Sequence, residues 1–227
     1  MDNRPTIDSF IQQLQNNSIF SGLDAQMLQR LAQEARWRDY AAGEVVMLEG
    51  EALSGLYYLQ SGWLKIVKIS PGGREQVLRF IEAGNTFNEV SVFTQSPNPA
   101  TAIALEPAGV WFIRQESVMR LLREQPGFAE NIIAKMANRL LYLVSLVTDL
   151  SLRPVTARLA RLILEGADGD VLVRPRWFTQ AELAARLGTV PDVVQRSLRH
   201  LEKEGVIKVE RQRIHILDMQ ALSELGM

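Results

Sequence analysis

The stretch Phe178–Glu202 has the pattern of two short amphipathic helices around one glycine. Thr179 can cap the first helix, with Glu182 as the reciprocal partner of a capping box. Gly188 suits the tight turn between the helices, and Pro191 suits the first position of the second helix. Apolar and small residues at helical spacing give both helices a buried face: Leu183, Ala184, Leu187, Val194, Leu198 and Leu201. This pattern predicts a helix-turn-helix.

The outer face of the second helix carries the residue types that read DNA bases. Arg196 can pair with guanine, Gln195 with adenine and Asp192 with the amino group of cytosine. Thr179, Arg199 and Lys203 are better placed for phosphates. We predict a DNA interface made of Thr179, Gln180, Pro191, Asp192, Val193, Gln195, Arg196, Arg199, Arg211 and Arg213. The alternative is a helical hairpin with a solvated charged face.

Two alternating runs follow between Val206 and Leu217, around a basic polar turn. This pattern predicts a β-hairpin wing, with Arg211 and Arg213 beside the groove. A plain surface hairpin is the alternative.

The region between Trp37 and Ile113 has a different pattern. Short runs of β-branched and aromatic residues alternate with glycines and no helical period separates them, which predicts a β barrel or roll. The runs are 44–48, 56–59, 63–69, 76–81 and 109–113. Short helices are predicted between Asp8 and Arg36, with Asp24 as a cap.

One long helix is predicted from about Pro126 to Leu152. Apolar residues step by 3, 4, 3, 4 and 3 positions, as in a coiled-coil seam, and we predict dimerisation through Ile133, Met136, Leu140, Leu143, Val147 and Leu150. Packing of this helix on its own β domain is the alternative, and one helix can serve both purposes. Arg153-Pro154 ends it. The predicted domains are 1–125, 126–152 and 153–227.

Composition narrows the function. Residues 1–149 hold 13 Lys and Arg against 16 Asp and Glu, whereas residues 150–227 hold 12 against 10, so the C-terminal part is the better polyanion binder.

The absence of cysteine excludes disulfides, thiolate-held iron–sulfur clusters and thiolate nucleophiles. We find no catalytic triad, metal-ligand cluster or phosphate loop, and predict no enzyme. Without a signal sequence or a membrane-length apolar run, a cytoplasmic location is expected.

The sequence resembles the Crp/Fnr family of bacterial regulators over nearly its whole length. The C-terminal pattern is Gln180 to Leu201, Glu204-Gly205-Val206-Ile207 and Arg213-Ile214-His215-Ile216-Leu217-Asp218. The N-terminal pattern is Gly43-Glu44, Glu49-Gly50-Glu51, Tyr58-Leu59-Gln60-Ser61-Gly62, Gly84, Phe87-Asn88-Glu89, Ala100-Thr101 and Ala104-Leu105-Glu106-Pro107.

The resemblance implies an α+β protein with three parts. These are an N-terminal double-stranded β-helix (jelly-roll, cyclic-nucleotide-binding-like) domain, a long dimerisation helix and a C-terminal winged helix-turn-helix. It also implies a homodimer that binds inverted repeats in double-stranded DNA and recruits or blocks RNA polymerase. An effector in the β-roll would control the homodimer allosterically.

The departures from the family pattern concern the effector. Cyclic-nucleotide binders of the family carry a Gly-Glu pair for the ribose and an Arg-Ser or Arg-Thr pair for the phosphate. Here Asn88 replaces the glycine before Glu89, and Asn98 and Pro99 stand at the phosphate positions. A phosphate thus loses its charge-assisted partner, which argues against a cyclic nucleotide, although Arg74 or Arg79 could substitute. The predicted effector site is Trp63, Arg74, Asn88, Glu89, Asn98, Pro99, Leu143 and Val144.

Other sensing modes of the family can be compared in the same way. The segment Asn85–Glu89, with Tyr57-Tyr58 and Lys65-Ile66, also resembles the nitric-oxide-responsive denitrification regulators. The histidines are His200 and His215 alone, so a histidine of the sensor domain cannot hold haem. Three possibilities remain for the effector: haem held by other ligands, an apolar effector, or no effector. A further alternative for the whole protein is a ligand sensor whose helix-turn-helix contacts another protein instead of DNA.

The second helix of the motif also departs from the family pattern. Val190-Pro191-Asp192-Val193-Val194 replaces the common Ser-Arg-Glu-Thr-Val run, so Val190 cannot cap and Pro191 cannot reach a base as arginine would. We therefore expect a different DNA sequence, or weaker discrimination, because each bidentate base contact contributes roughly 1–3 kcal/mol.

Overall fold

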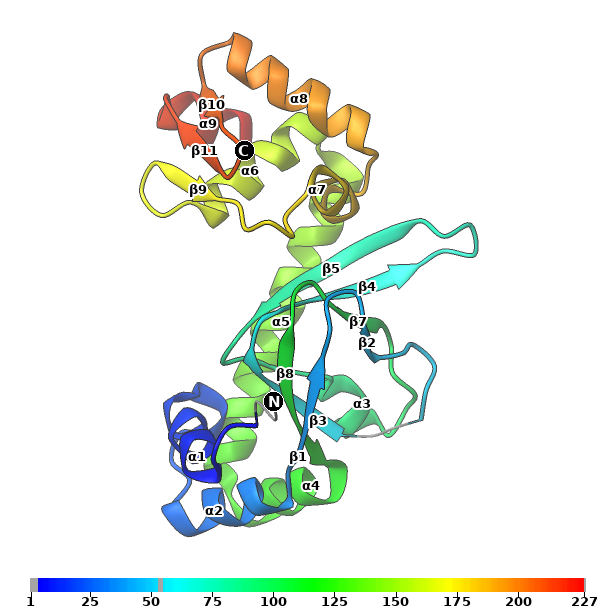
Figure 1. Cartoon of the computed structure of the whole chain (residues 1–227), viewed down its shortest axis with the longest axis vertical. Helices are drawn as coiled ribbons and strands as arrows, with labels where there is room; N and C mark the ends of the chain where they lie inside the picture. The colour runs from blue at the N-terminus through cyan, green and yellow to red at the C-terminus, as the bar shows by residue number, and fades with distance from the viewer. Residues whose placement is uncertain (1–3, 53–54, 227) are drawn as a thin grey trace. The chain divides into compact units, whose positions relative to one another are not determined.

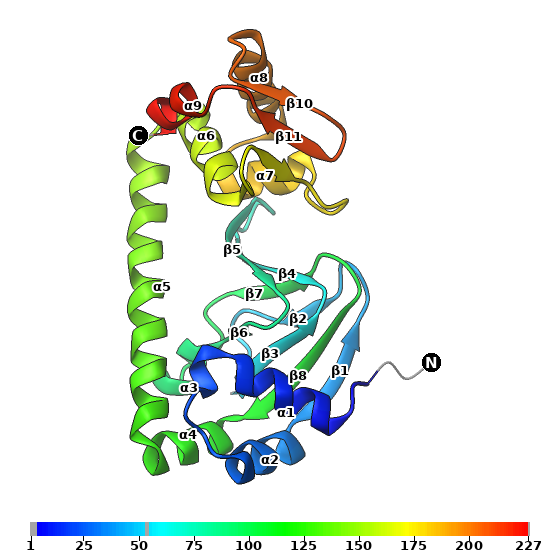
Figure 2. The same ribbon diagram turned by 90° about the vertical axis from the view of Figure 1, so that its left-hand side faces the viewer.

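The computed structural model describes residues 4–52 and 55–226 and divides into two compact units (Figures 1 and 2). The first unit contains Met1–Lys68 and Arg79–Tyr142, and the second contains Ile69–Leu78 and Leu143–Met227. Within the described ranges, no helix combines the length and the apolar character that crossing a membrane requires.

One apolar cluster of the first unit lies between two four-stranded sheets. One sheet has the order β1 (Arg36–Tyr40), β8 (Ala108–Arg114), β3 (Gly55–Ser61) and β6 (Thr86–Phe87). The other has the order β2 (Val45–Met47), β7 (Thr101–Ala104), β4 (Trp63–Ile69) and β5 (Glu75–Glu82). Alternate side chains of both sheets meet in one apolar cluster, which includes Tyr57, Leu59, Val110, Leu64, Ile81 and Ala102. The predicted β-roll is confirmed.

Short helices close one end of the roll. They are α1 (Ile7–Asn16), the 3₁₀ turn Ser18–Phe20, α2 (Ala25–Glu34) and α4 (Gln115–Glu124). Asp24 caps α2 as predicted, because its side chain accepts a hydrogen bond from the Met27 amide at 2.7 Å. The Phe10 ring stacks on Trp111 with centroids 4.4 Å apart, which joins α1 to β8.

One expectation for the roll is wrong. A helix, α3 (Glu89–Thr94), lies between β6 and β7 in the region predicted to hold strands alone. Asn88 precedes it with φ 70° and ψ 23°, a left-handed conformation that asparagine tolerates. Six residues are too few to show a helical period, so the pattern of residue types could not reveal this turn.

The long helix α5 (Pro126–Leu152) has the predicted bounds, and Figure 2 shows it unbroken. Its N-terminal part belongs to the first unit, where Phe128 and Ile132 are buried in a second apolar cluster with side chains of α1, α2, α4, β3 and β8. Much of the predicted seam is exposed in the single chain: Ile133 67%, Met136 36%, Leu140 62% and Val147 62%, with Leu143 and Leu150 half-buried.

The second unit is a three-helix core with a small sheet. The helices α6 (Val155–Gly166), α7 (Gln180–Leu187) and α8 (Pro191–Lys203) precede β10 (Ile207–Val209) and β11 (Arg213–Ile216). Both helices of the motif and the wing hairpin are confirmed as structural elements. Two further elements were not predicted from the sequence. The strand β9 (Val171–Val173) pairs with β11, and α9 (Met219–Gly226) packs on α6.

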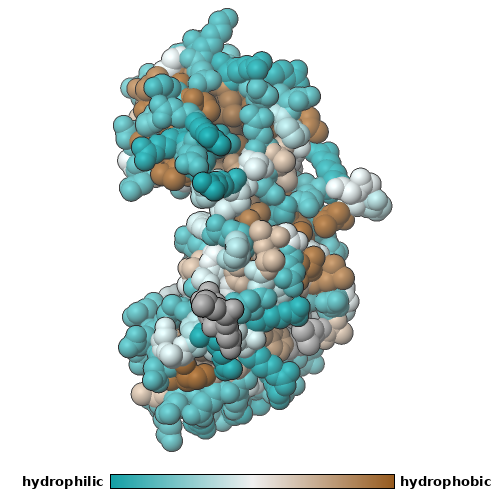
Figure 3. Space-filling model, viewed as in Figure 1, coloured by the Kyte–Doolittle hydropathy of each residue, from teal (hydrophilic) through white to brown (hydrophobic). Residues whose placement is uncertain are grey.

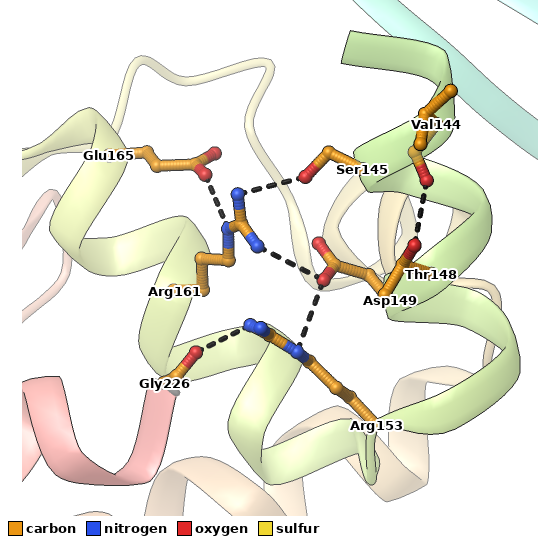
Figure 4. Close-up of polar contacts among 8 residues, drawn as sticks. All are labelled: Val144, Ser145, Thr148, Asp149, Arg153, Arg161, Glu165 and Gly226. Atoms are coloured by element: carbon orange, nitrogen blue, oxygen red, sulfur yellow. Dashed lines mark hydrogen bonds and ion pairs between the residues drawn. The ribbon is translucent and has the colours of Figure 1, made fainter. Parts of the chain in front are cut away.

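A polar network joins the end of α5 to the following helices (Figure 4). Arg161 donates to Ser145 Oγ at 2.8 Å, to Asp149 Oδ1 at 3.2 Å and to Glu165 Oε1 at 2.7 Å. Arg153 pairs with the same Asp149 oxygen at 3.5 Å and donates to the Gly226 carbonyl at 2.6 Å. The network therefore holds the last turns of α5, α6 and α9 in one arrangement.

Candidate nucleic-acid interface and effector site

The helix-turn-helix has the local geometry that its sequence predicts. Thr179 Oγ1 accepts a hydrogen bond from the Glu182 amide at 3.3 Å, which caps α7. Gly188 ends α7 with φ 66°, in the left-handed region that favours glycine. A Cβ at Gly188 would lie 2.6 Å from Leu150 Cδ2, so that side chain would have to shift to admit any other residue. Val190 gives no side-chain cap, and Pro191 begins α8.

The exposed face of α8 is polar and basic. Val194, Leu198 and Leu201 are buried against the rest of the second unit. Pro191, Asp192, Arg196, Arg199 and Lys203 are exposed, whereas Val193 and Gln195 are half-buried. Figure 3 shows hydrophilic residues over the region where Figure 1 places α8.

Within the described part of the chain, the cations of this face have no acidic partner. Among the residues that the structure describes, none of Arg196, Arg199 and Lys203 forms an ion pair. Their charges are therefore available to a polyanion.

A second basic group lies beside the start of α7. Of the predicted residues, Thr179, Arg211 and Arg213 are exposed and Gln180 is half-buried. Thr179 and Arg211 line a surface hollow together with Arg174, Pro175, Arg176, Phe178 and Gln212. Sequence reasoning missed Arg174 and Arg176. The run Arg174-Pro175-Arg176 ahead of the helix cap was a usable signal, but only strand β9 brings it beside the wing.

The position of Arg174 is set by the backbone around it. Its amide donates to the Gln212 carbonyl at 2.8 Å, and its guanidinium donates to the Phe178 carbonyl at 3.2 Å. Burial lowers the pKa of Arg174 below its ordinary value. Its Nε is buried without a hydrogen-bond partner in the described chain. This arrangement holds a positive charge next to the exposed end of α7.

In the predicted effector site, Asn88 and Asn98 bond to each other. Asn88 Nδ2 donates to Asn98 Oδ1 and to the Gly55 carbonyl, both at 3.1 Å. Asn98 Nδ2 donates to the Leu48 carbonyl at 3.1 Å. Both asparagines are buried, and the side-chain atom left unpaired is the acceptor Asn88 Oδ1. A phosphate needs donors, so this pair leaves little for one to bind.

Glu89 is a paired, largely buried carboxylate. Lys135 Nζ lies 2.6 Å from Glu89 Oε1, and Thr86 Oγ1 donates to the same oxygen at 2.6 Å. Burial by itself would raise the pKa of Glu89, but Lys135 and Thr86 hold it below its ordinary value. Sequence reasoning missed Lys135. It lies on α5, and no residue pattern signals which β-roll side chain that helix will meet.

The pKa of Lys135 moves in the direction opposite to that of an ordinary paired lysine. Burial lowers the pKa, the nearby charges of Arg79 and Arg139 add to this, and Glu89 only partly opposes it. The 2.6 Å contact with Glu89 indicates that both groups are charged. Positive charge therefore exceeds negative charge at this place.

The other predicted effector residues are described one by one. Trp63 is half-buried in β4, and Pro99 is exposed with its carbonyl accepting from Lys68 at 3.2 Å. Arg74 belongs to the second unit and donates to the Gly188 carbonyl at 2.7 Å. Leu143 is half-buried and Val144 is 56% exposed, both on the part of α5 in the second unit. In the described chain, no group of acidic and histidine side chains could hold a metal ion.

A β-roll domain followed by a long helix and a winged helix-turn-helix defines a class of sensor-linked transcriptional regulators. Residues 37–125 match the cyclic nucleotide-binding domain, and residues 157–225 match the Crp-like helix-turn-helix domain. The chain belongs to the Crp/Fnr family of transcriptional regulators.

Relatives and solved structures agree with this assignment. The CRP-like cAMP-activated global transcriptional regulator of Mycobacterium tuberculosis is 26% identical over 90% of this chain and 94% of its own. The cyclic AMP receptor protein of Thermus thermophilus is 26% identical over 94% and 98%. FixK2 from Bradyrhizobium japonicum has a similar fold, with a TM-score of 0.76, 20% identity, and coverage of 85% of this chain and 98% of FixK2.

Proposed function

We propose that the protein is a homodimeric, sequence-specific DNA-binding regulator controlled by an effector in the β-roll other than cyclic AMP. The observation that carries the proposal is the exposed face of α8, where Arg196, Arg199 and Lys203 have no acidic partner in the described chain. The N-terminal half of α8 enters the major groove, and the wing and the Arg174–Arg176 region follow the phosphates. The proposed domains are 1–125, 126–152 and 153–227.

Dimerisation is proposed along α5. Ile133, Leu140 and Val147 are each about two-thirds exposed, and they repeat at heptad spacing. Burying each such side chain against a second copy would contribute about 1–2 kcal/mol. A two-fold pair of recognition helices then faces half-sites about 34 Å apart on the DNA. Like other members of the family, the dimer would act on RNA polymerase in the cytoplasm.

The proposal excludes cyclic AMP on the chemistry of this chain, although the names of two relatives state cAMP activation or binding. Asn88 and Asn98 use their amides on each other and on backbone carbonyls. Glu89, at the ribose position of the family, is held by Lys135. A ligand would have to displace these partners before it could bind as a cyclic nucleotide does in the family.

The test is selection of duplexes from a random library, followed by titration of three variants. Arg196→Ala should reduce the preference for the selected sequence, because a bidentate base contact contributes about 1–3 kcal/mol. Arg199→Ala should weaken binding to all duplexes alike. The slope of log affinity against log salt concentration should fall by about one, the contribution of one phosphate contact. Arg123→Ala, an exposed arginine on α4, controls for the change in net charge.

Selection of an inverted repeat that Arg196→Ala no longer prefers supports the proposal. A confirmed dimer without salt-sensitive duplex affinity, in the presence or absence of candidate effectors, contradicts it and favours a helix-turn-helix that contacts protein.

A further inference from the structure

The surface hollow beside the wing belongs wholly to the second unit and has a volume of about 450 Å³. This volume is within the range of roughly 300–1,000 Å³ that small-molecule sites occupy. Among the residues that the structure describes, the lining has three arginines and no acidic side chain: Arg174, Arg176 and Arg211, with Pro175, Phe178, Thr179 and Gln212. The pairing of β9 with β11 brings the two arginine-bearing segments together. The hollow therefore combines a concave surface with three positive charges.

The protein supplies no counter-charge to these arginines within the described ranges. Arg174, Arg176 and Arg211 form no ion pair there. Glu210 precedes Arg211 in the chain, but its carboxylate lies 3.0 Å from Lys208 Nζ instead. Like charges that face one hollow repel each other, and a bound anion would offset that repulsion.

Arg174 is the recessed member of the three. It is half-buried, whereas Arg176 and Arg211 are exposed. Its guanidinium is held in place because Nη2 donates to the Phe178 carbonyl at 3.2 Å. Its Nε is buried without a hydrogen-bond partner in the described chain, and an unpaired buried donor of a charged group costs free energy. A compact anion that enters the hollow can reach this guanidinium, whereas a duplex is too wide to enter.

A phosphate group matches the donors of the hollow. Each guanidinium presents a planar fork of N–H donors that fits two phosphate oxygens, and forks on different segments can hold different oxygens of one ligand. Thr179 adds a further donor. Its Oγ1 accepts from the Glu182 amide at 3.3 Å, which leaves the hydroxyl hydrogen available to a ligand oxygen.

We propose that this hollow binds a small phosphate-bearing molecule through Arg174, Arg176 and Arg211, and that the bound molecule competes with the DNA backbone. Binding of the small molecule is independent of the proposed function. The competition rests on the proposed function, because the same arginines are there assigned to DNA phosphates. An occupied hollow presents negative charge where a duplex needs cations, so the ligand would weaken DNA binding from within the DNA-binding unit.

The first test is isothermal titration calorimetry of the full-length protein with pyrophosphate at constant ionic strength. We expect saturable binding of one pyrophosphate per chain. The lack of saturable binding overturns the inference and leaves the hollow to the DNA backbone alone.

Variants then locate the bound pyrophosphate. Arg176→Ala and Arg211→Ala should each weaken its binding about tenfold, with an unchanged melting temperature because both side chains are exposed. Arg174→Lys keeps the charge but loses the planar fork, so it should also weaken binding. Arg123→Ala, the exposed arginine on α4, should bind as the wild type does. Unchanged affinity in Arg176→Ala and Arg211→Ala overturns the inference. An equal loss in Arg199→Ala also overturns it, because this result would place the anion on α8.

The second test is competition on the duplex selected by the wild-type protein. Pyrophosphate should raise the apparent Kd for this duplex more than sodium chloride of the same ionic strength does. In the double variant Arg176→Ala/Arg211→Ala, the two salts should act alike. Equal effects of the two salts on the wild type would overturn the proposed competition.

The two measurements also separate this inference from the proposed function. A protein that selects an inverted repeat but does not bind pyrophosphate in the hollow retains the proposed function and loses this site. A protein that binds pyrophosphate there but recognises no duplex retains the site and loses the proposed function.

Discussion

The ion pair between Glu89 and Lys135 gives the sharpest stability prediction. Replacing Lys135 by methionine keeps the length of the side chain but leaves the Glu89 carboxylate without its partner. Only 15% of the Glu89 side chain and 23% of the Lys135 side chain are exposed, so solvent cannot take over the solvation of the carboxylate. Breaking a buried pair by removing one partner costs about 3–5 kcal/mol. We expect the lower end, about 3 kcal/mol, because Thr86 still donates to Glu89.

The assay is urea unfolding followed by circular dichroism at one fixed protein concentration, since dimerisation would make stability depend on concentration. Glu89→Gln/Lys135→Met is the matched control. It removes both charges, and we expect it to recover most of the loss. A loss below about 1 kcal/mol for Lys135→Met would refute the reasoning and indicate that Arg139 pairs with Glu89 in place of Lys135.

The pH dependence gives a second readout of the same variant. Without Lys135, burial becomes the main influence on Glu89, and its pKa in the folded state rises above the unfolded value of about 4.3. A folded-state pKa that is raised gives stability that is lost as the pH rises through it. The gap in stability between the wild type and Lys135→Met should therefore narrow as the pH falls from 8 to 5. A gap that does not change with pH would contradict the assignment of the loss to an unpaired carboxylate.

Three further predictions concern the second unit and the seam. Asp149→Asn removes the acceptor charge of the network in Figure 4 and should cost about 1–2 kcal/mol in urea unfolding, because Asp149 and Arg161 are 18% and 30% exposed. Gly188→Ala should cost about 2–3 kcal/mol, whereas Gly169→Ala, with a similar φ of 63° but no atom within 4 Å of the added Cβ, should cost about 1 kcal/mol. Equal losses of unfolding free energy in these two variants would rule out crowding at Gly188 as the cause. Leu140→Glu should convert a dimer to a folded monomer in light scattering; an unchanged mass would place the interface elsewhere.

The elements that the sequence predicted well are those with strong local signals. The bounds of α5 follow from its heptad spacing and from the proline after Arg153, and the ends of α7 and α8 follow from Thr179, Gly188 and Pro191. These signals act through backbone conformation and hydrogen bonds within a few residues. The strands of the roll were predicted because β-branched runs between glycines have the period and length of strands.

Short elements were predicted less well. Helix α3 has six residues and β9 has three, too few for a period to be visible. Strand β9 exists because its residues find a free edge at β11, a partner about 40 positions away in the chain. Arg174 and Arg176 follow β9, so their place beside the wing also depends on this pairing.

The order of the β-roll, the long helix and the helix-turn-helix therefore follows from local residue patterns, as do the residue types on the outer face of α8. Which charged side chains meet depends on the packing of elements that are far apart in the chain. Glu89 and Lys135 are 46 positions apart, and Asn88 meets Asn98 because α3 turns the chain between them. A side chain's spacing in the sequence reports its own helix or strand, whereas its partner across the core depends on how the elements pack.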